Sequence, residues 1–344
     1  MASISRPHPA SHAIHLHRRL FIASAVSTFI ASARGSQTHA QGTPGASSSP
    51  APEGWVSGTS IPVARSEFPA TVLDGKVYVA GGFGAESTFS RFDPVTSEWV
   101  DLASLPEPRN HLGLTALDGA VYLAGGHSSE TMATDTFWRY DVASDRWDEE
   151  PVLPQGPRGA LGCTALDGKV YVVGGSSRDL GGPATNDAAA YDPATGAWTT
   201  LPSLPTAREH LSVGSADGLL IAVGGRDGSN VDISMTSANE VFDPKTGAWE
   251  KRAALPVPRS GMGVAADGSH IAVIGGEGER GIYTAANWYD PATDTWSALP
   301  DLPGGRHGVA AAIVDNRLYA IGGSTQAWNV QNSFGVDWLR LERP

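Results

Sequence analysis

Residues 73–82 read LDGKVYVAGG, which is a turn, an apolar run and a glycine pair. Five of the six turns of this kind in the chain are Asp-Gly, and the sixth is Asp315-Asn316. Asp-Gly between apolar runs is a strong hairpin signal, because glycine accepts a positive φ at no steric cost. We therefore predict that each repeat opens with a two-stranded hairpin. The glycine pairs begin at Gly81, Gly125, Gly174, Gly224, Gly275 and Gly322.

A second hairpin follows in each of the first five repeats. A third run ends in an aromatic residue and Asp, as in Phe92-Asp93, and a tryptophan stands six residues after that Asp, here Trp99. Four antiparallel strands in a unit of about 50 residues are typical of a propeller blade. The other tryptophans at this spacing are Trp147, Trp198, Trp249 and Trp296.

Paired glycines, an aromatic before Asp-Pro and a tryptophan at fixed spacing resemble the kelch repeat, over residues 54–340. The resemblance implies an all-β fold, a six-bladed β-propeller of four-stranded antiparallel blades. The sixth repeat lacks a fourth strand, whereas Trp55 precedes Arg65 by ten residues, as Trp99 precedes Arg109. We therefore expect the N-terminal strand to close the last blade, which protects its edge.

Residues 1–40 have the architecture of an export signal. An apolar run from Leu20 to Ala33 follows basic residues, and small residues lead to a predicted cleavage after Ala40. The pair Arg18-Arg19 resembles a twin-arginine signal, with an ordinary secretory signal as the alternative. Residues 41–53 are rich in Gly, Ser, Pro and Ala and predict a flexible linker, with the propeller over 54–344. We expect a periplasmic or secreted protein without membrane association once the signal is removed.

The charge of the remaining chain narrows its partners. After residues 1–40, it holds 20 basic and 36 acidic residues, a formal net charge of −16. Such a surface disfavours binding to nucleic acid or anionic membranes. Cys163 is the sole cysteine, so no internal disulfide forms, and its apolar strand pattern predicts a buried, inert thiol. We expect a monomer.

An arginine precedes each glycine pair by 16 residues, and these arginines have two interpretations. As scaffold, each guanidinium would satisfy loop carbonyls or a carboxylate of a neighbouring blade. As ligand-binding groups, six arginines at the start of six inner strands would converge on the channel mouth and make it electropositive. The second interpretation favours an anionic ligand, such as a sugar acid or an acidic peptide. The six are Arg65, Arg109, Arg158, Arg208, Arg259 and Arg306.

Topology places the candidate site on one face of the disc. The segments that carry the arginines and the loops after the glycine pairs lie on the same face, and the Asp-Gly turns lie on the other. The irregular loops 176–187 and 226–237 belong to the arginine face, where binding residues of rigid scaffolds usually reside. Besides the six arginines, we assign to ligand binding the polar residues that break the repeat there: Glu67, His111, His127, Glu209, His210, Arg226 and His307.

Three functions suit these residues. The first is recognition of an anionic small molecule or a partner protein, since nothing in the sequence requires chemistry. The second follows from a resemblance to periplasmic kelch mutarotases of sialic acid: a cofactor-independent sugar-acid mutarotase or epimerase. Its acid/base would be Glu209 or His210, and its carboxylate anchor would be Arg208, Arg259 or Arg306.

The third function is that of a metal enzyme similar to galactose oxidase. No Tyr/His pair stands in the arginine-face segments, so we expect no cofactor and no resident metal. Two metal interpretations stay open. One is a site made of imidazoles alone, from His111, His210 and His307. The other is a weakly signalled calcium loop at 227–232.

Overall fold

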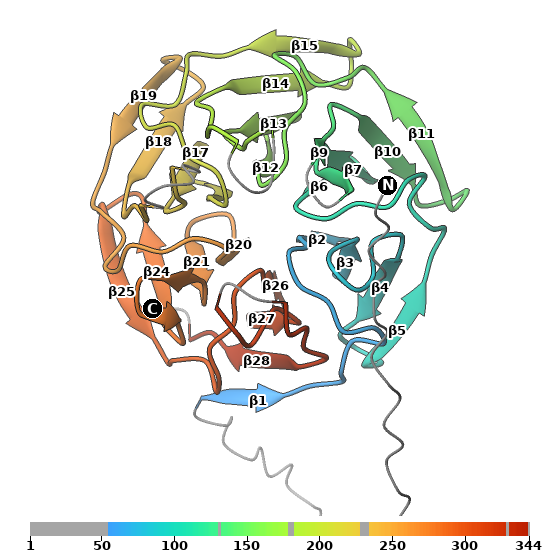
Figure 1. Cartoon of the computed structure of the whole chain (residues 1–344), viewed down its shortest axis with the longest axis vertical. Coiled ribbons are helices and arrows are strands. Elements are labelled where there is room, and N and C mark those ends of the chain that lie inside the picture. Colours follow the sequence, from blue (N-terminus) through green and yellow to red (C-terminus); the bar gives the residue numbers. More distant parts are fainter. Residues whose placement is uncertain (1–53, 130–131, 178–181, 228–233, 328–329, 343–344) are drawn as a thin grey trace, which may run out of the picture. The chain divides into compact units, whose positions relative to one another are not determined.

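The computed structural model describes residues 54–342, apart from 130–131, 178–181, 228–233 and 328–329. Every regular element in this part of the chain is a β-strand (Figure 1). It contains no helix long and apolar enough to cross a membrane. The predicted signal, residues 1–40, and the predicted linker, residues 41–53, lie outside the described residues.

The strands form the six predicted four-stranded antiparallel blades. Blades 1 to 3 are β2 (Ala70–Leu73), β3 (Lys76–Ala80), β4 (Phe89–Asp93) and β5 (Glu98–Asp101); β6 (Gly113–Leu117), β7 (Ala120–Ala124), β10 (Phe137–Asp141) and β11 (Arg146–Glu150); and β12 (Gly162–Leu166), β13 (Lys169–Val173), β14 (Ala188–Asp192) and β15 (Ala197–Thr200). Blades 4 to 6 are β16 (Ser212–Ala216), β17 (Leu219–Val223), β18 (Asn239–Asp243) and β19 (Ala248–Lys251); β20 (Gly263–Ala266), β21 (Ile271–Ile274), β24 (Ala286–Asp290) and β25 (Thr295–Leu299); and β26 (Ala310–Val314), β27 (Arg317–Ile321), β28 (Val336–Arg340) and β1 (Trp55–Ser57). Two short hairpins form separate two-stranded sheets: β8 (His127–Ser129) pairs with β9 (Met132–Ala133), and β22 (Glu277–Gly278) pairs with β23 (Gly281–Ile282).

The blades close into a ring, as predicted. Each innermost strand lies beside the innermost strand of the next blade, and β26 of blade 6 lies beside β2 of blade 1 (Figure 1). The last blade is completed by β1, whose Trp55 stands opposite Leu339 of β28. The prediction that the N-terminal strand closes the last blade is confirmed.

The repeated residues hold neighbouring blades together. The second glycine of each pair donates its N–H to the carbonyl of the arginine in the next blade, from Gly82 to Arg109 (2.9 Å) round to Gly323 and Arg65 (2.9 Å). The first glycine has no room for a side chain, because a Cβ on Gly81 would lie 2.4 Å from the Arg109 carbonyl oxygen. This contact explains why the first glycine of each pair recurs.

The tryptophans make a second circular set of bonds. The tryptophan on the fourth strand of each blade donates its indole N–H to a carbonyl of the preceding blade's outer connection, as Trp147 does to Ala103 (3.1 Å) and Trp55 does to Pro300 (2.7 Å). The apolar core lies mainly between blades. Phe89 of blade 1, for example, packs edge-on against Tyr140 of blade 2, with 4.8 Å between the ring centroids.

Candidate functional site

The six arginines lie inside the propeller wall. Each is at most 5% exposed, and their guanidinium groups point between the strands of their own blades. Arg208, for example, pairs with Glu240 of β18 and donates to the Ala222 carbonyl at 2.9 Å. The electropositive channel mouth expected from these arginines is therefore not formed by them. The interpretation as scaffold accounts for their contacts.

One position of the third strand, three residues before its last Asp in blades 1 to 5, supplies the partner of the wall arginine in blades 4 to 6. Arg306 pairs with Asp337 there, and Arg259 donates to Asn287 at 2.8 Å. In blade 2 this position holds Trp138, and the Arg109 guanidinium lies over its ring, 4.9 Å from the centroid. In blade 1 it holds Ser90, whereas Arg65 donates to the Gly81 carbonyl (3.4 Å). Blade 3 has Ala189 at this position, and the three guanidinium nitrogens of Arg158 have no hydrogen-bond partner among the described residues. The full set of residues at this position is Ser90, Trp138, Ala189, Glu240, Asn287 and Asp337.

A ring of backbone hydrogen bonds encircles the channel. It joins the residues that stand two positions after each wall arginine in the sequence. His111 N–H donates to Glu67 O (3.0 Å), Ala160 N–H to His111 O (2.8 Å), and the pattern continues to Glu67 N–H, which donates to Gly308 O (2.9 Å). All six residues have φ between 50° and 60°. We call this set the throat ring: Glu67, His111, Ala160, His210, Gly261 and Gly308.

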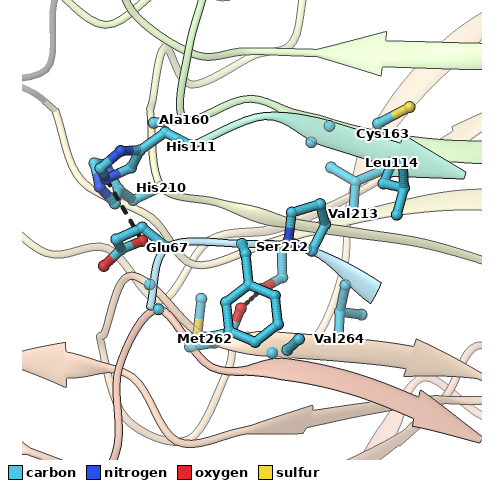
Figure 2. A pocket seen from close by; sticks show the side chains of 18 of the residues that line it. Glu67, His111, Leu114, Ala160, Cys163, His210, Ser212, Val213, Met262 and Val264 are labelled. Atoms are coloured by element: carbon cyan, nitrogen blue, oxygen red, sulfur yellow. Dashed lines mark hydrogen bonds and ion pairs between the residues drawn. The ribbon is translucent and has the colours of Figure 1, made fainter. Parts of the chain in front are cut away.

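Three of the six throat positions carry polar side chains. Glu67, His111 and His210 lie at one end of a cavity of about 120 Å³, and apolar residues such as Leu114 and Val213 of the inner strands line the rest (Figure 2). The positive φ costs a non-glycine residue about 1–2 kcal/mol. Backbone strain and polar groups therefore coincide at the throat, which is a common property of functional sites.

A second tier of polar residues packs against the throat ring. In each blade, the residue after the wall arginine forms a β-bridge with the residue after the glycine pair. Glu209 pairs in this way with Arg226, and Asn110 with His127. Arg226 forms ion pairs with Glu209 and with Glu277 (3.2 Å). The members that matter here are Asn110, His127, Glu209, Arg226, Glu277 and His307.

The two tiers form one buried network. His307 donates from Nδ1 to Glu67 Oε1 (3.0 Å) and from Nε2 to a backbone carbonyl (2.8 Å), so both ring nitrogens are protonated. His210 donates from Nδ1 to Glu209, and the rings of His111 and His210 lie 4.7 Å apart. Three carboxylates and one guanidinium thus meet four imidazoles in the channel throat.

The network shifts the pKa of its members in opposite directions. Burial acts to raise the pKa of Glu67, but the charge of His111 and the hydrogen bond from His307 hold this pKa far below its ordinary value. Burial acts to lower the pKa of His307, but its hydrogen bond to Glu67 raises it to about 9. Burial also lowers the pKa of His127 to about 3, and the neighbouring imidazoles add to this effect.

The sequence-based site is only partly assembled. The structure brings together every repeat-breaking residue assigned to ligand binding, and it separates them from the six wall arginines. Glu277 was missed as a site residue, although it follows its glycine pair as His127 and Arg226 follow theirs. Cys163 is half-buried and lines the channel, and burial raises its pKa to about 12. The predicted calcium loop, 227–232, lies outside the described residues except for its first residue.

One group in the described part of the chain has the composition of a metal site. Glu67, His111 and His210 each offer one ligand atom, and these atoms lie within 4.8 Å of one another. The imidazole site that the sequence left open had His307 as its third member, but here His307 donates to Glu67 instead.

Fold and site together define a six-bladed β-propeller with a polar throat. The KLHDC2/KLHL20/DRC7 Kelch-repeats domain matches residues 55–204, and the Kelch motif matches residues 207–256 and 258–303. The chain is thus a kelch-repeat propeller, a class that generally mediates interactions with proteins or ligands.

Similar proteins share parts of the chain. It is 34% identical to alpha-scruin of Limulus polyphemus over 94 residues, 27% of this chain and 10% of that protein. It is 28% identical to Kelch-like protein terF of Aspergillus terreus over 165 residues, 44% of this chain and 35% of that protein. Among solved structures, YjhT matches with a TM-score of 0.68 and 18% identity, over 78% of this chain and 93% of that one, which shows the shared fold.

Proposed function

We propose that this chain is a recognition propeller that binds a polar ligand at the throat. One observation carries the proposal: the same backbone position holds Glu67, His111 and His210 in three blades, but Ala or Gly in the other three. The ring forms with either, so the fold does not require the polar groups. Residues that break a repeat on a common scaffold are the ones expected to serve binding.

The throat's own groups define the ligand class. Glu67 accepts hydrogen bonds, whereas the imidazolium of His307 and the guanidinium of Arg226 are donors. A ligand with hydroxyl groups and a carboxylate matches this mixture, which favours a sugar acid or an acidic side chain of a partner protein. The wall arginines are not part of this proposal, because their donors lie inside the blades.

Thermal unfolding against a ligand panel tests the proposal. The panel holds sialic acid, uronic acids, neutral sugars and acidic peptides. A ligand that binds only the native state stabilises it by about 2.7 kcal/mol at 100 times its Kd, and this raises the Tm by about 5–10 °C. Glu67→Gln and His111→Gln should abolish the shift. His270→Gln is the matched control, because His270 lies beside an Asp-Gly turn.

Two outcomes would contradict ligand binding at the throat. If a ligand raises the Tm of the Glu67→Gln and His111→Gln variants as much as that of the wild type, the throat is not its binding site. If no ligand shifts the Tm and a partner protein binds these variants as tightly as the wild type, recognition takes place elsewhere.

A second candidate, a cofactor-independent sugar-acid mutarotase or epimerase, is favoured by the carboxylate and the imidazolium that meet at the throat. Glu67 Oε1 and His307 Nδ1 lie 3.0 Å apart, so one group that accepts a proton stands beside one that donates it. Anomer exchange of a bound sugar acid, followed by NMR, tests this role. Binding without acceleration of exchange would remove it.

We also propose that residues 1–40 direct export, on the strength of their sequence alone. A tagged full-length chain should appear in the exported fraction of a bacterial host, shortened by about this segment. Lys in place of both Arg18 and Arg19 should block a twin-arginine route and leave a general secretory route working.

A further inference from the structure

We propose that Glu67, His111 and His210 bind a divalent transition-metal ion through one carboxylate and two imidazoles. The inference rests on the throat being the binding site and deepens that function by naming what the throat holds. The three ligand atoms lie within 4.8 Å of one another. Two imidazoles and one glutamate form the ligand set of many open zinc sites.

The distance between the first two ligands fits a shared ion. His111 Nε2 lies 3.5 Å from Glu67 Oε2, which is too long for a good hydrogen bond. Two ligands bound tetrahedrally at 2.0–2.1 Å are about 3.3 Å apart. An ion between these two atoms would therefore need little movement of either side chain.

The surrounding residues orient both imidazoles for metal binding. His111 donates from Nδ1 to Asn110 Oδ1 (2.7 Å), and His210 donates from Nδ1 to the Glu209 carboxylate. Donation from Nδ1 fixes the tautomer, so a metal would bind through Nε2. At His210 the ion would replace the contact of Arg226 Nη2 with Nε2 (3.4 Å). The carboxylate ligand is also held, because His307 donates to Glu67 Oε1 at 3.0 Å.

The local charge suits a dication. Arg226 opposes a cation, since its Nη2 lies 3.4 Å from His210 Nε2. Its charge is offset by the carboxylates of Glu209 and Glu277, with which it forms ion pairs. With Glu67, three buried carboxylates face one guanidinium and the imidazolium of His307, which leaves one negative charge that a dication would offset.

The proposed ion would face the cavity. Glu67, His111 and His210 all line the space of about 120 Å³, and three protein ligands leave a fourth tetrahedral position for an exogenous oxygen (Figure 2). A carboxylate or hydroxyl of the ligand would occupy this position. The ion would thus supply the preference for an anionic ligand that the wall arginines do not.

Zinc binding to the chelator-treated full chain tests the site. Isothermal titration with ZnCl₂ should show one ion per chain, and Co²⁺ should give the visible bands of a tetrahedral site. His111→Gln and His210→Gln should each weaken Zn²⁺ binding by more than about 100-fold. Asn110→Ala, which removes only the orienting acceptor, should weaken it by about 10–100-fold. His270→Gln should bind as the wild type does.

Two results would overturn the metal site. One is the absence of Zn²⁺ binding at millimolar metal while circular dichroism shows a folded chain. The other is unchanged affinity in both imidazole variants. The ligand panel separates this outcome from the function. If the chain binds no Zn²⁺ but a ligand raises its Tm, recognition stands and the metal site fails; zinc binding without any ligand effect does the reverse.

Discussion

Arg208 and Arg158 occupy the same wall position in adjacent blades but differ in their partners, and this difference predicts different costs on removal. Arg208 pairs with Glu240, which is wholly buried. Arg158 faces Ala189, and its guanidinium nitrogens have no partner among the described residues. We therefore compare Arg208→Met with Arg158→Met, because methionine keeps much of the apolar stem.

The structure sets the expected magnitudes. In Arg208→Met the Glu240 carboxylate keeps only its contacts with Thr206, at 2.7 and 3.3 Å, so a buried charge loses its counter-ion. Loss of one partner of a buried pair costs about 3–5 kcal/mol. Arg158→Met removes a buried charge without orphaning another, and should change the free energy of unfolding by less than about 1 kcal/mol.

Equilibrium urea unfolding measures the difference. With a slope near 3 kcal/mol per molar, Arg208→Met should lower the midpoint by about 1 M, and Arg158→Met should leave it nearly unchanged. The double variant Arg208→Met with Glu240→Leu should recover most of the loss. Equal midpoints for the two single variants would refute the reasoning that the partner on the third strand sets the cost.

Three further predictions follow from the same contacts. Ala189→Glu should supply the missing partner of Arg158 and raise the free energy of unfolding by about 1.5–3 kcal/mol, measured by the same urea curves. Trp55→Ala removes a half-buried indole and its bond to Pro300, and should destabilise the closing strand by about 2 kcal/mol, visible as faster amide exchange in β28. Because the pKa of Cys163 is raised to about 12, its alkylation at pH 8 should be at least about 100-fold slower in the native chain than in denaturant, and should accelerate up to pH 12.

The blades were predictable from the sequence because their signals are local. Asp-Gly turns, glycine pairs and tryptophans each indicate the structure of the few residues around them, and their recurrence along the chain strengthens the prediction. The closing strand was predictable for the same reason, since Trp55 and Arg65 keep the spacing of the other blades. In every repeat the residue after the arginine bridges the residue after the glycine pair, as Ser66 does Phe83, which accounts for the fixed spacing.

The direction of the arginine side chains was not predictable in this way. It depends on the residue two positions later, whose positive φ turns the chain into the channel. At Glu67, His111 and His210 no glycine signals this turn. Alignment of the repeats contains the clue, because Gly261 and Gly308 stand at the same position in blades 5 and 6. The wall arginine and the throat residue are thus neighbours in sequence with opposite surroundings.

The wall position and the throat position differ in how strongly the fold restricts their side chains. At the wall position, the arginine carbonyl joins two blades by accepting from the glycine pair of the preceding blade, and the buried guanidinium lies within its own blade. The throat position contributes only backbone atoms to the ring, so its side chain is free to vary from Gly308 to Glu67. Buried charge at the throat is nevertheless costly, and half of the blades avoid it. Polar groups gathered at positions where the scaffold accepts glycine or alanine are therefore not required by the fold, and this is the argument for the ligand site proposed there.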